Sequence, residues 1–290
     1  ARSGIAGAQD AFDIVDHLAN QPQTMEYLAV KLCQLFVHED FAHGYFLNVS
    51  ATTPEADLVR ACMNAWSTPG PDGRKGNLRL VLRAIFESDL FRGQLAQAHK
   101  VKSPVELIAS AIRCQRMPLG GGTFSAGSDG YDLIEPVYRM GMDLFNDFTP
   151  DGYPENGNEW IDTGTIAERY RFLQNLMMRE DDALKDVDYG SGGAQNVSNP
   201  VAILQARLPA ASLTDPAAVT DEFLRILFPG EGRANLDLLR SEGVRLLNSN
   251  DAGTPGSSPF SALSTSSTDY DLRVRALVGL LLCHPYFMEQ

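Results

Sequence analysis

The chain has 290 residues, of which 44% are hydrophobic and 21% are charged, so it is long enough to bury a substantial core. Its formal net charge of -13 disfavours nucleic acid and anionic membrane surfaces as partners, because both attract clustered Lys and Arg. The longest apolar run, 276–283, is far shorter than the about 18 residues that a membrane span needs. We therefore expect cationic or neutral partners and no membrane span.

Apolar residues recur at helical spacing in eight segments. In the first of them, 22–37, Met25, Leu28 and Leu32 share one face behind a proline near the start. The other segments are 54–66, 77–87, 103–116, 163–178, 215–228, 233–247 and 269–283. Ser103 and Glu106 predict a capping box at one helix start. Strand-like alternation is nearly absent, so the predicted fold is all-α, an irregular multi-helix domain with long loops.

Four irregular stretches separate these helices, namely 68–76, 119–130, 185–200 and 249–268. Long loops in compact domains are uncommon, and 185–200 is the best candidate boundary. It would divide an N-terminal helical block, 1–184, from a C-terminal helical block, 201–290. Because the apolar segment 276–287 needs burial against other helices, we expect the two blocks to pack together as one composite domain.

The most informative segment is the acidic loop 141–164, which is rich in Gly, Pro and Asn and is followed directly by a helical pattern. The candidate ligand-binding residues are Asp151, Tyr153, Asn158, Glu159 and Trp160. In one interpretation Tyr153 and Trp160 stack on a sugar ring while Asp and Asn side chains bond to its hydroxyl groups. In the other, Trp160 is an apolar anchor that holds the loop on the helix beginning near Thr163.

The same loop offers oxygen ligands to a cation. The residues concerned are Asp143, Asp147, Asp151, Glu155, Asn156, Asn158, Glu159 and Asp162. Calcium accepts many oxygen atoms in flexible geometry, although no EF-hand spacing is present. A calcium site and a solvated acidic rim both remain open, and no other cofactor is expected. Two close carboxylates could also cleave a glycosidic bond, although a sequence does not fix the separation that this chemistry requires.

The other motifs give no catalytic assignment. His38 and His43 lie five residues apart, whereas helical zinc sites place two histidines four apart, so no metal site is assigned there. Ser191 lies in Gly-Ser-Gly-Gly and not in the Gly-x-Ser-x-Gly of a hydrolase elbow. The chain therefore carries no recognised nucleophile, general base or metal set.

Four charged residues are predicted to form a structural ion network between helices: Lys102, Glu106, Arg113 and Arg169. Glu106 and Arg113 lie seven residues apart and therefore share one helix face. If the role is structural, replacing Arg169 should lower thermal stability more than it alters any ligand affinity.

The four cysteines, Cys33, Cys62, Cys114 and Cys283, lie far apart in the sequence. None has Cys-x-x-Cys spacing, which argues against a zinc knuckle or a redox motif. Two states remain open for them: buried free thiols, or one or two structural disulfides formed in an oxidising compartment.

Several segments together resemble a known bacterial family. They are 22–37, 102–113, the Gly152-Tyr153-Pro154 loop with Trp160 and 169–172 behind it, and the closing 280–287. In order and spacing they resemble the family catalogued as domain of unknown function 1800. Members of that family are typically longer at the N-terminus and often exported, which implies that this chain is the C-terminal half of such a protein. It opens Ala-Arg-Ser-Gly, so a targeting segment is expected to be absent or already removed.

The resemblance implies an extracytoplasmic location, which would be periplasmic, cell-surface or secreted. Family genes often neighbour those of an exported family related to sulfatases and alkaline phosphatases, which implies such a protein as a partner. No activity comes with the family. The chain also departs from its commoner pattern at Tyr153-Pro-Glu, where Gly-Trp often stands, so no role of that Trp is carried over.

We therefore expect an exported binding or assembly module and not a self-contained enzyme. The expected partner is another protein chain or a second copy of this one, with a glycan as a further alternative. Two other functions stay open. One is hydrolysis of an extracellular polymer such as polysaccharide by carboxylates of the 143–162 loop; the other is a structural subunit of a cell-surface complex.

Overall fold

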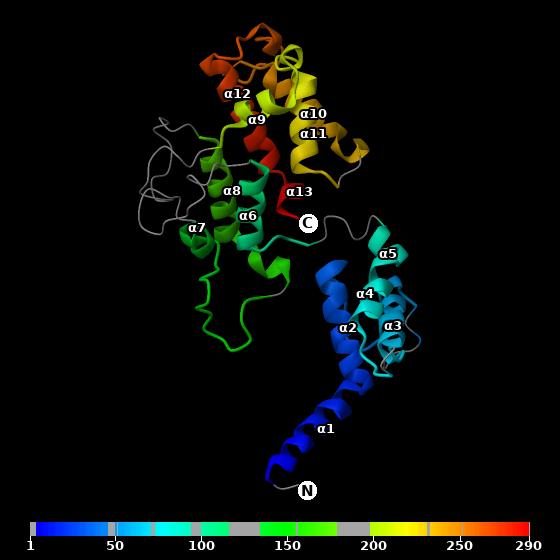
Figure 1. Cartoon of the computed structure of the whole chain (residues 1–290). Helices are drawn as coiled ribbons and strands as arrows, with labels where there is room; N and C mark the ends of the chain where they lie inside the picture. Colours follow the sequence, from blue (N-terminus) through cyan, green and yellow to red (C-terminus); the bar gives the residue numbers. More distant parts are fainter. Residues whose placement is uncertain are drawn as a thin grey trace. The chain divides into compact units, whose positions relative to one another are not determined.

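The computed structural model describes residues 4–45, 50, 52–70, 73–93, 100–115, 134–154, 156–178, 198–230, 233–250 and 252–289. Within these ranges it contains thirteen α-helices and no β-strand, which confirms the predicted all-α class. None of the described helices combines the length and the apolar composition needed to cross a bilayer. The helices belong to two compact units, unit 1 (1–100) and unit 2 (101–290), which we describe separately (Figure 1).

Unit 1 is built on three mutually packed helices, α2 (Pro22–Phe36), α3 (Pro54–Ser67) and α4 (Leu78–Phe86). The short helix α5 (Asp89–Arg92) packs against α3 and α4. The core consists of Ala29, Val30, Cys33, Val37, Phe41, Leu58, Val59, Cys62, Val81, Ile85 and Leu90. These residues recur at steps of three and four along each helix, which is why the sequence pattern predicted the three helices correctly.

Helix α1 (Ala8–Ala19), which we did not predict, precedes this core. None of its described residues is buried, and Phe12, Ile14, Val15 and Leu18 are each more than half exposed. The end of the helix is tied to unit 1 by Trp66, whose Nε1 donates a hydrogen bond of 3.1 Å to the carbonyl oxygen of Ala19.

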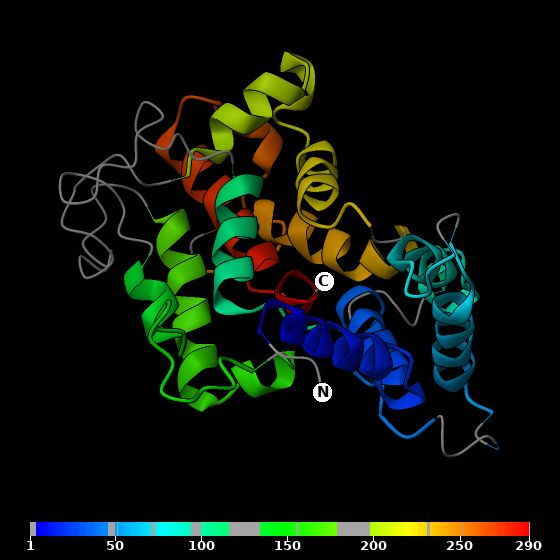
Figure 2. The same ribbon diagram turned by 60° about the horizontal axis from the view of Figure 1, so that its bottom comes forward.

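Unit 2 is organised around helix α12 (Thr268–Leu282) (Figures 1 and 2). Its packing partners are α8 (Thr163–Met177), α9 (Pro200–Arg207), α10 (Pro216–Leu227), α11 (Arg233–Leu247) and α13 (Pro285–Met288). Helix α7 (Ile134–Arg139) packs against both α6 (Pro104–Cys114) and α8. Tyr270, Val274, Leu277, Val278, Leu281 and Leu282 of α12 are buried. A helix buried on several sides needs apolar residues around most of its circumference, which explains the apolar 276–287 segment.

Helix α11 approaches α10 and α12 closely at Gly243. A Cβ atom at this position would lie 2.7 Å from Cγ2 of Thr220 in α10 and 2.8 Å from Cδ1 of Leu277 in α12. Both separations are shorter than carbon atoms tolerate. The absence of a side chain therefore allows α11 to pack on both helices.

Two arginines of α12 bind the ends of neighbouring helices. Arg273 donates from Nη1 to the carbonyl oxygen of Leu247, the last residue of α11, at 3.0 Å. Arg275 donates from Nη1 to the carbonyl oxygen of Met177, the last residue of α8, at 3.4 Å. Carbonyl groups of the last helical turn lack intrahelical partners and carry partial negative charge. The two guanidinium groups thus hold α8 and α11 on α12.

The boundary between the compact units falls between Lys100 and Val101, whereas the sequence analysis placed its candidate boundary at 185–200. Most of that stretch, residues 185–197, lies outside the described ranges, as does the predicted loop 119–130. Helices α8 and α9, which flank it, both pack on α12, and their buried residues belong to one core. The apolar faces before and after the stretch are therefore buried together in unit 2.

Candidate functional site

The predicted site loop, 141–164, connects α7 to α8 in unit 2, where Figure 1 shows it in green. Gly141 and Gly152 have φ angles of +95° and +77°, which glycine adopts readily, and they make sharp turns near the ends of its irregular part. At the far end Asp162 caps α8, because its Oδ1 accepts hydrogen bonds from the N–H groups of Thr165 and Gly164. These bonds lower the pKa of the Asp162 carboxyl, so the carboxylate serves to cap the start of α8.

Tyr153 and Trp160 fix the base of the loop. Tyr153 donates from Oη to the carbonyl oxygen of Asp143 at 2.5 Å, and Trp160 donates from Nε1 to that of Pro154 at 3.1 Å. Their ring centroids are 5.6 Å apart and the rings are tilted by 38°. Trp160 is only 6% exposed, so almost none of its ring is open to a ligand. This arrangement favours the interpretation of Trp160 as an apolar anchor over its interpretation as a platform that stacks on a sugar ring.

The apolar exposure of the loop lies at its tip, in residues that the sequence analysis did not select. Phe145 and Phe148 are 103% and 101% exposed. Phe145 is the one described residue other than glycine with a positive φ, 64°. Short local bonds hold the tip in place, from Asn146 Nδ2 to Asp143 Oδ2 at 2.7 Å and from the Thr149 N–H to Asp147 Oδ1 at 2.7 Å.

The remaining predicted ligand-binding residues, Asp151, Asn158 and Glu159, are exposed. Oε1 of Glu159 accepts a hydrogen bond of 3.1 Å from Asn156 Nδ2, and Glu155 lies outside the described residues. Among the described residues, no group of three or more His, Cys, Asp or Glu side chains is suited to hold a metal ion. The structure thus brings Tyr153 and Trp160 into contact, while the polar residues form an exposed acidic rim.

In the predicted ion network, burial lowers the pKa of Lys102, and the nearby Glu106 carboxylate opposes this shift. Arg169 is fully buried, and its Nη1 donates to the main-chain oxygen of Lys102 at 2.8 Å. The Lys102 ammonium donates to the carbonyl oxygen of Phe287 at 2.5 Å and lies 4.2 Å from the centroid of that phenyl ring. Oε2 of Glu106 accepts from the Ser103 N–H in the predicted capping box, and Arg113 is exposed. Main-chain oxygen atoms therefore accept hydrogen bonds from the buried Arg169 and the partly buried Lys102.

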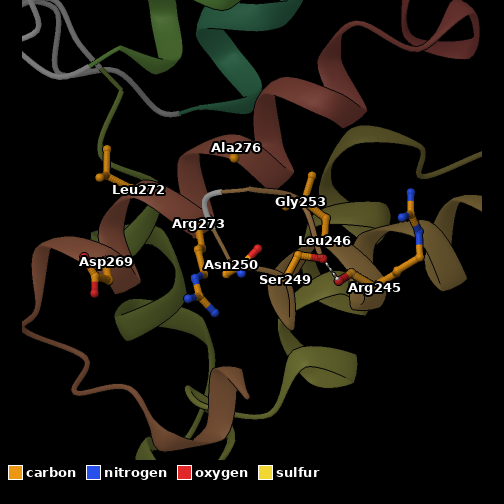
Figure 3. A pocket seen from close by; sticks show the side chains of 9 residues that line it. All are labelled: Arg245, Leu246, Ser249, Asn250, Gly253, Asp269, Leu272, Arg273 and Ala276. Carbon is orange, nitrogen blue, oxygen red and sulfur yellow. Dashed lines mark hydrogen bonds between the residues drawn. The ribbon is translucent and has the colours of Figure 1, made fainter. Parts of the chain in front are cut away.

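A cavity of about 380 Å³ lies elsewhere in unit 2, between α11, α12 and the segment that follows α11 (Figure 3). It is lined by Arg245, Leu246, Ser249, Asn250, Gly253, Asp269, Leu272, Arg273 and Ala276. Several of its polar side chains bind nearby main chain: Arg273 the carbonyl oxygens of Leu247 and Ser258, and Ser249 that of Arg245. None of the predicted site residues lines this cavity, because it forms between elements that the sequence analysis treated separately.

The family of the chain can be recognised from its sequence. Residues 1–288 match the sequence profile of the family described as "Protein of unknown function (DUF1800)". The chain belongs to the DUF1800 family. The match confirms the resemblance carried by the 22–37, 102–113 and 280–287 segments. The DUF1800 region covers both compact units and includes the 141–164 loop and the cavity. Comparisons of this DUF1800 chain with curated proteins and with solved structures give no match.

Proposed function

We propose that this chain is an exported binding or assembly module and that residues 143–151, the loop tip, form its contact element. The observation that carries the proposal is the complete exposure of Phe145 and Phe148. Removing apolar surface from water is favourable by roughly 25 cal/mol per Å², so two bare phenyl rings leave substantial binding free energy for a partner. Buried aromatic anchors of this kind dominate many protein interfaces.

The loop tip is also organised before any partner binds. Its base is fixed by the Tyr153 and Trp160 hydrogen bonds, and its turns are fixed by the bonds to Asp143 and Asp147. The positive φ of Phe145 costs about 1 kcal/mol or more for a residue with a Cβ atom. Backbone strain of this kind clusters at binding and catalytic sites. A pre-ordered loop loses less conformational entropy on binding, which favours a contact role.

The charge around the two rings supports a partner with a basic surface. Asp143, Asp147 and Asp151 flank Phe145 and Phe148 within the loop tip. The matching surface is an apolar recess bordered by Lys or Arg on another protein chain, since complementary charge favours encounter and correct register. An anionic membrane or a second copy of this chain, with its own charge of -13, would instead meet the carboxylates with like charge. The sulfatase- and phosphatase-related exported family implied by the resemblance is the first candidate.

The alternative of polymer hydrolysis gains no specific support from the loop. Oδ1 of Asp147 accepts hydrogen bonds from the N–H and hydroxyl groups of Thr149, and Glu159 accepts one from Asn156. Such short-range bonds are typical of carboxylates that stabilise turns. We therefore retain the binding module as the single proposed function.

Photo-crosslinking from the loop tip tests the proposal. A benzoylphenylalanine introduced in place of Phe148 is compared, in cells of the source organism, with the same group in place of Leu238. Leu238 is 73% exposed on α11 of the same unit, so it controls for random collisions. We expect an adduct with one other polypeptide from position 148 and none from 238. Equal adducts at both positions, or none at either, would contradict the proposal. An adduct between two copies of this chain would contradict the proposed second protein and indicate self-assembly through the loop tip.

A further inference from the structure

Cys33 and Cys62 lie together in the core of unit 1. Cys33 is on α2 and Cys62 is on the adjacent helix α3, and both side chains are completely buried. Both belong to the same buried core cluster, in which α2 packs on α3, and the two thiols shift each other's pKa. The other two cysteines of the chain, Cys114 and Cys283, belong to unit 2. The fold thus selects one specific pair from four cysteines that are widely separated in the sequence.

We propose that Cys33 and Cys62 form a disulfide in an oxidising compartment and so join α2 to α3 covalently. Both are free thiols in the structure described here. Their burial in one core, on two helices that pack together, favours such a bond, because cysteines that lie far apart cannot be bridged without movement of the backbone. Secreted and periplasmic proteins commonly contain such bonds.

The oxidant is a small-molecule disulfide such as oxidised glutathione. A protein thiolate attacks one of its sulfur atoms, forms a mixed disulfide and releases one glutathione thiolate. The second cysteine then loses its proton and attacks the mixed disulfide, which forms the Cys33–Cys62 bond and releases the second glutathione. The protons of the two cysteines pass to the two released thiolates, so the protein pair is oxidised while one glutathione disulfide is reduced to two thiols.

Burial sets the timing of these steps. In the folded protein the interaction of the two thiols lowers the pKa of Cys62 and raises that of Cys33, and burial raises the pKa of Cys33 further. Because both sulfur atoms are fully buried, exchange with glutathione takes place before unit 1 has closed or during local opening.

Refolding the full chain in a glutathione redox buffer tests the inference. Free thiols are blocked with N-ethylmaleimide under denaturing conditions, and the protein is examined by intact mass and peptide mapping. We expect two blocked cysteines, Cys114 and Cys283, and one linked peptide pair that contains Cys33 and Cys62. A Cys114→Ala/Cys283→Ala variant should still lose the mass of two hydrogen atoms, whereas Cys33→Ala should form no intramolecular bond to Cys62.

Four blocked cysteines after equilibration with oxidised glutathione would overturn the proposal, as would a Cys114–Cys283 link or a mixture of pairings. Thermal unfolding provides an independent readout. The bond would close the segment 33–62, and closure of a loop lowers the entropy of the unfolded chain. A reductant should therefore lower the Tm of the oxidised wild type but leave that of Cys33→Ala unchanged. If the alanine variant fails to fold, the linked peptide of the wild type still decides the question.

Discussion

Tyr270 donates a hydrogen bond from Oη to the main-chain oxygen of Leu213, 2.6 Å away, and this bond ties the first turn of α12 to the segment that precedes α10. The Tyr270 side chain is completely buried and stacks on Phe260 with ring centroids 5.0 Å apart. Burial raises the pKa of Tyr270 to about 12, because the phenolate cannot be solvated there.

This relationship predicts a loss of stability at alkaline pH. The folded protein keeps Tyr270 protonated, so the stabilisation is complete below the unfolded pKa of about 10 and disappears as pH rises toward about 12. Between these limits the free energy of unfolding should fall more steeply for the wild type than for Tyr270→Phe. At neutral pH the variant should be less stable by about 1–2 kcal/mol, because the Leu213 carbonyl loses its partner. Urea denaturation at a series of pH values measures both effects, and parallel curves would contradict the assignment.

Arg169→Ala should destabilise unit 2 by about 2–5 kcal/mol, because the substitution removes a large buried side chain and the partner of the Lys102 carbonyl. Arg169→Met should cost less. It fills most of the volume and removes Nε and Nη2, two buried atoms without a hydrogen-bond partner in the structure. Thermal unfolding ranks the two variants. An unchanged Tm in Arg169→Ala, combined with weaker crosslinking at position 148, would assign Arg169 to ligand binding instead.

Gly243→Ala should destabilise the protein although alanine is the better helix former. The added methyl group collides with Thr220 and Leu277, and overpacking of this kind costs about 1–3 kcal/mol. Gly279→Ala in α12 is the matched control. Its Cβ would lie 3.6 Å from Cγ of Met177, an ordinary contact, so this variant should gain up to about 1 kcal/mol from helix propensity. Equal effects in chemical denaturation would show that the close approach at Gly243 does not limit packing.

Phe145→Asn should stabilise the protein and weaken binding at the same time. Asparagine tolerates a positive φ better than phenylalanine does, so the free energy of unfolding should rise by up to about 1 kcal/mol. Phe148→Asn removes a similarly exposed ring without such a backbone gain, and it should leave stability unchanged. With a photo-crosslinker in place of Leu144, both substitutions should reduce the yield of adduct. If the double variant still crosslinked with full yield, the two phenyl rings would not be part of the proposed contact.

The helices with apolar faces directed into a core were predictable from the sequence. The 163–178 prediction matches α8, Thr163–Met177, and the expected capping box at Ser103 is present. Helices α1, α5, α7, α9 and α13 were not predicted. For α1 and α7 the reasons are physical. Helix α1 buries none of its described residues and has no side-chain cap, and α7 is six residues long with Pro136 inside it. Neither helix combines a long run of periodic apolar residues with a capping residue, the two signals from which a helix is inferred.

The loop was predictable as an unusual segment, but its exposed residues were not. Tyr153 and Trp160 were predicted to bind a ligand, whereas in the structure they lie at the base of the loop and Phe145 and Phe148 are exposed. Which aromatic ring is buried depends on hydrogen bonds to main-chain atoms several residues away. The backbone angle of Phe145 has no signature in a sequence either. The shared burial of Cys33 and Cys62 likewise depends on how α2 packs on α3 and not on cysteine spacing.

The pairing of Val101 with Glu289 brings the first and last described residues of unit 2 side by side, and the Lys102 N–H reinforces it with a bond of 2.8 Å to the Met288 oxygen. The polypeptide thus returns to its starting point after forming every helix of the unit. The chain therefore enters and leaves unit 2 at one place, so the covalent connections to unit 1 and to anything joined beyond residue 289 start side by side.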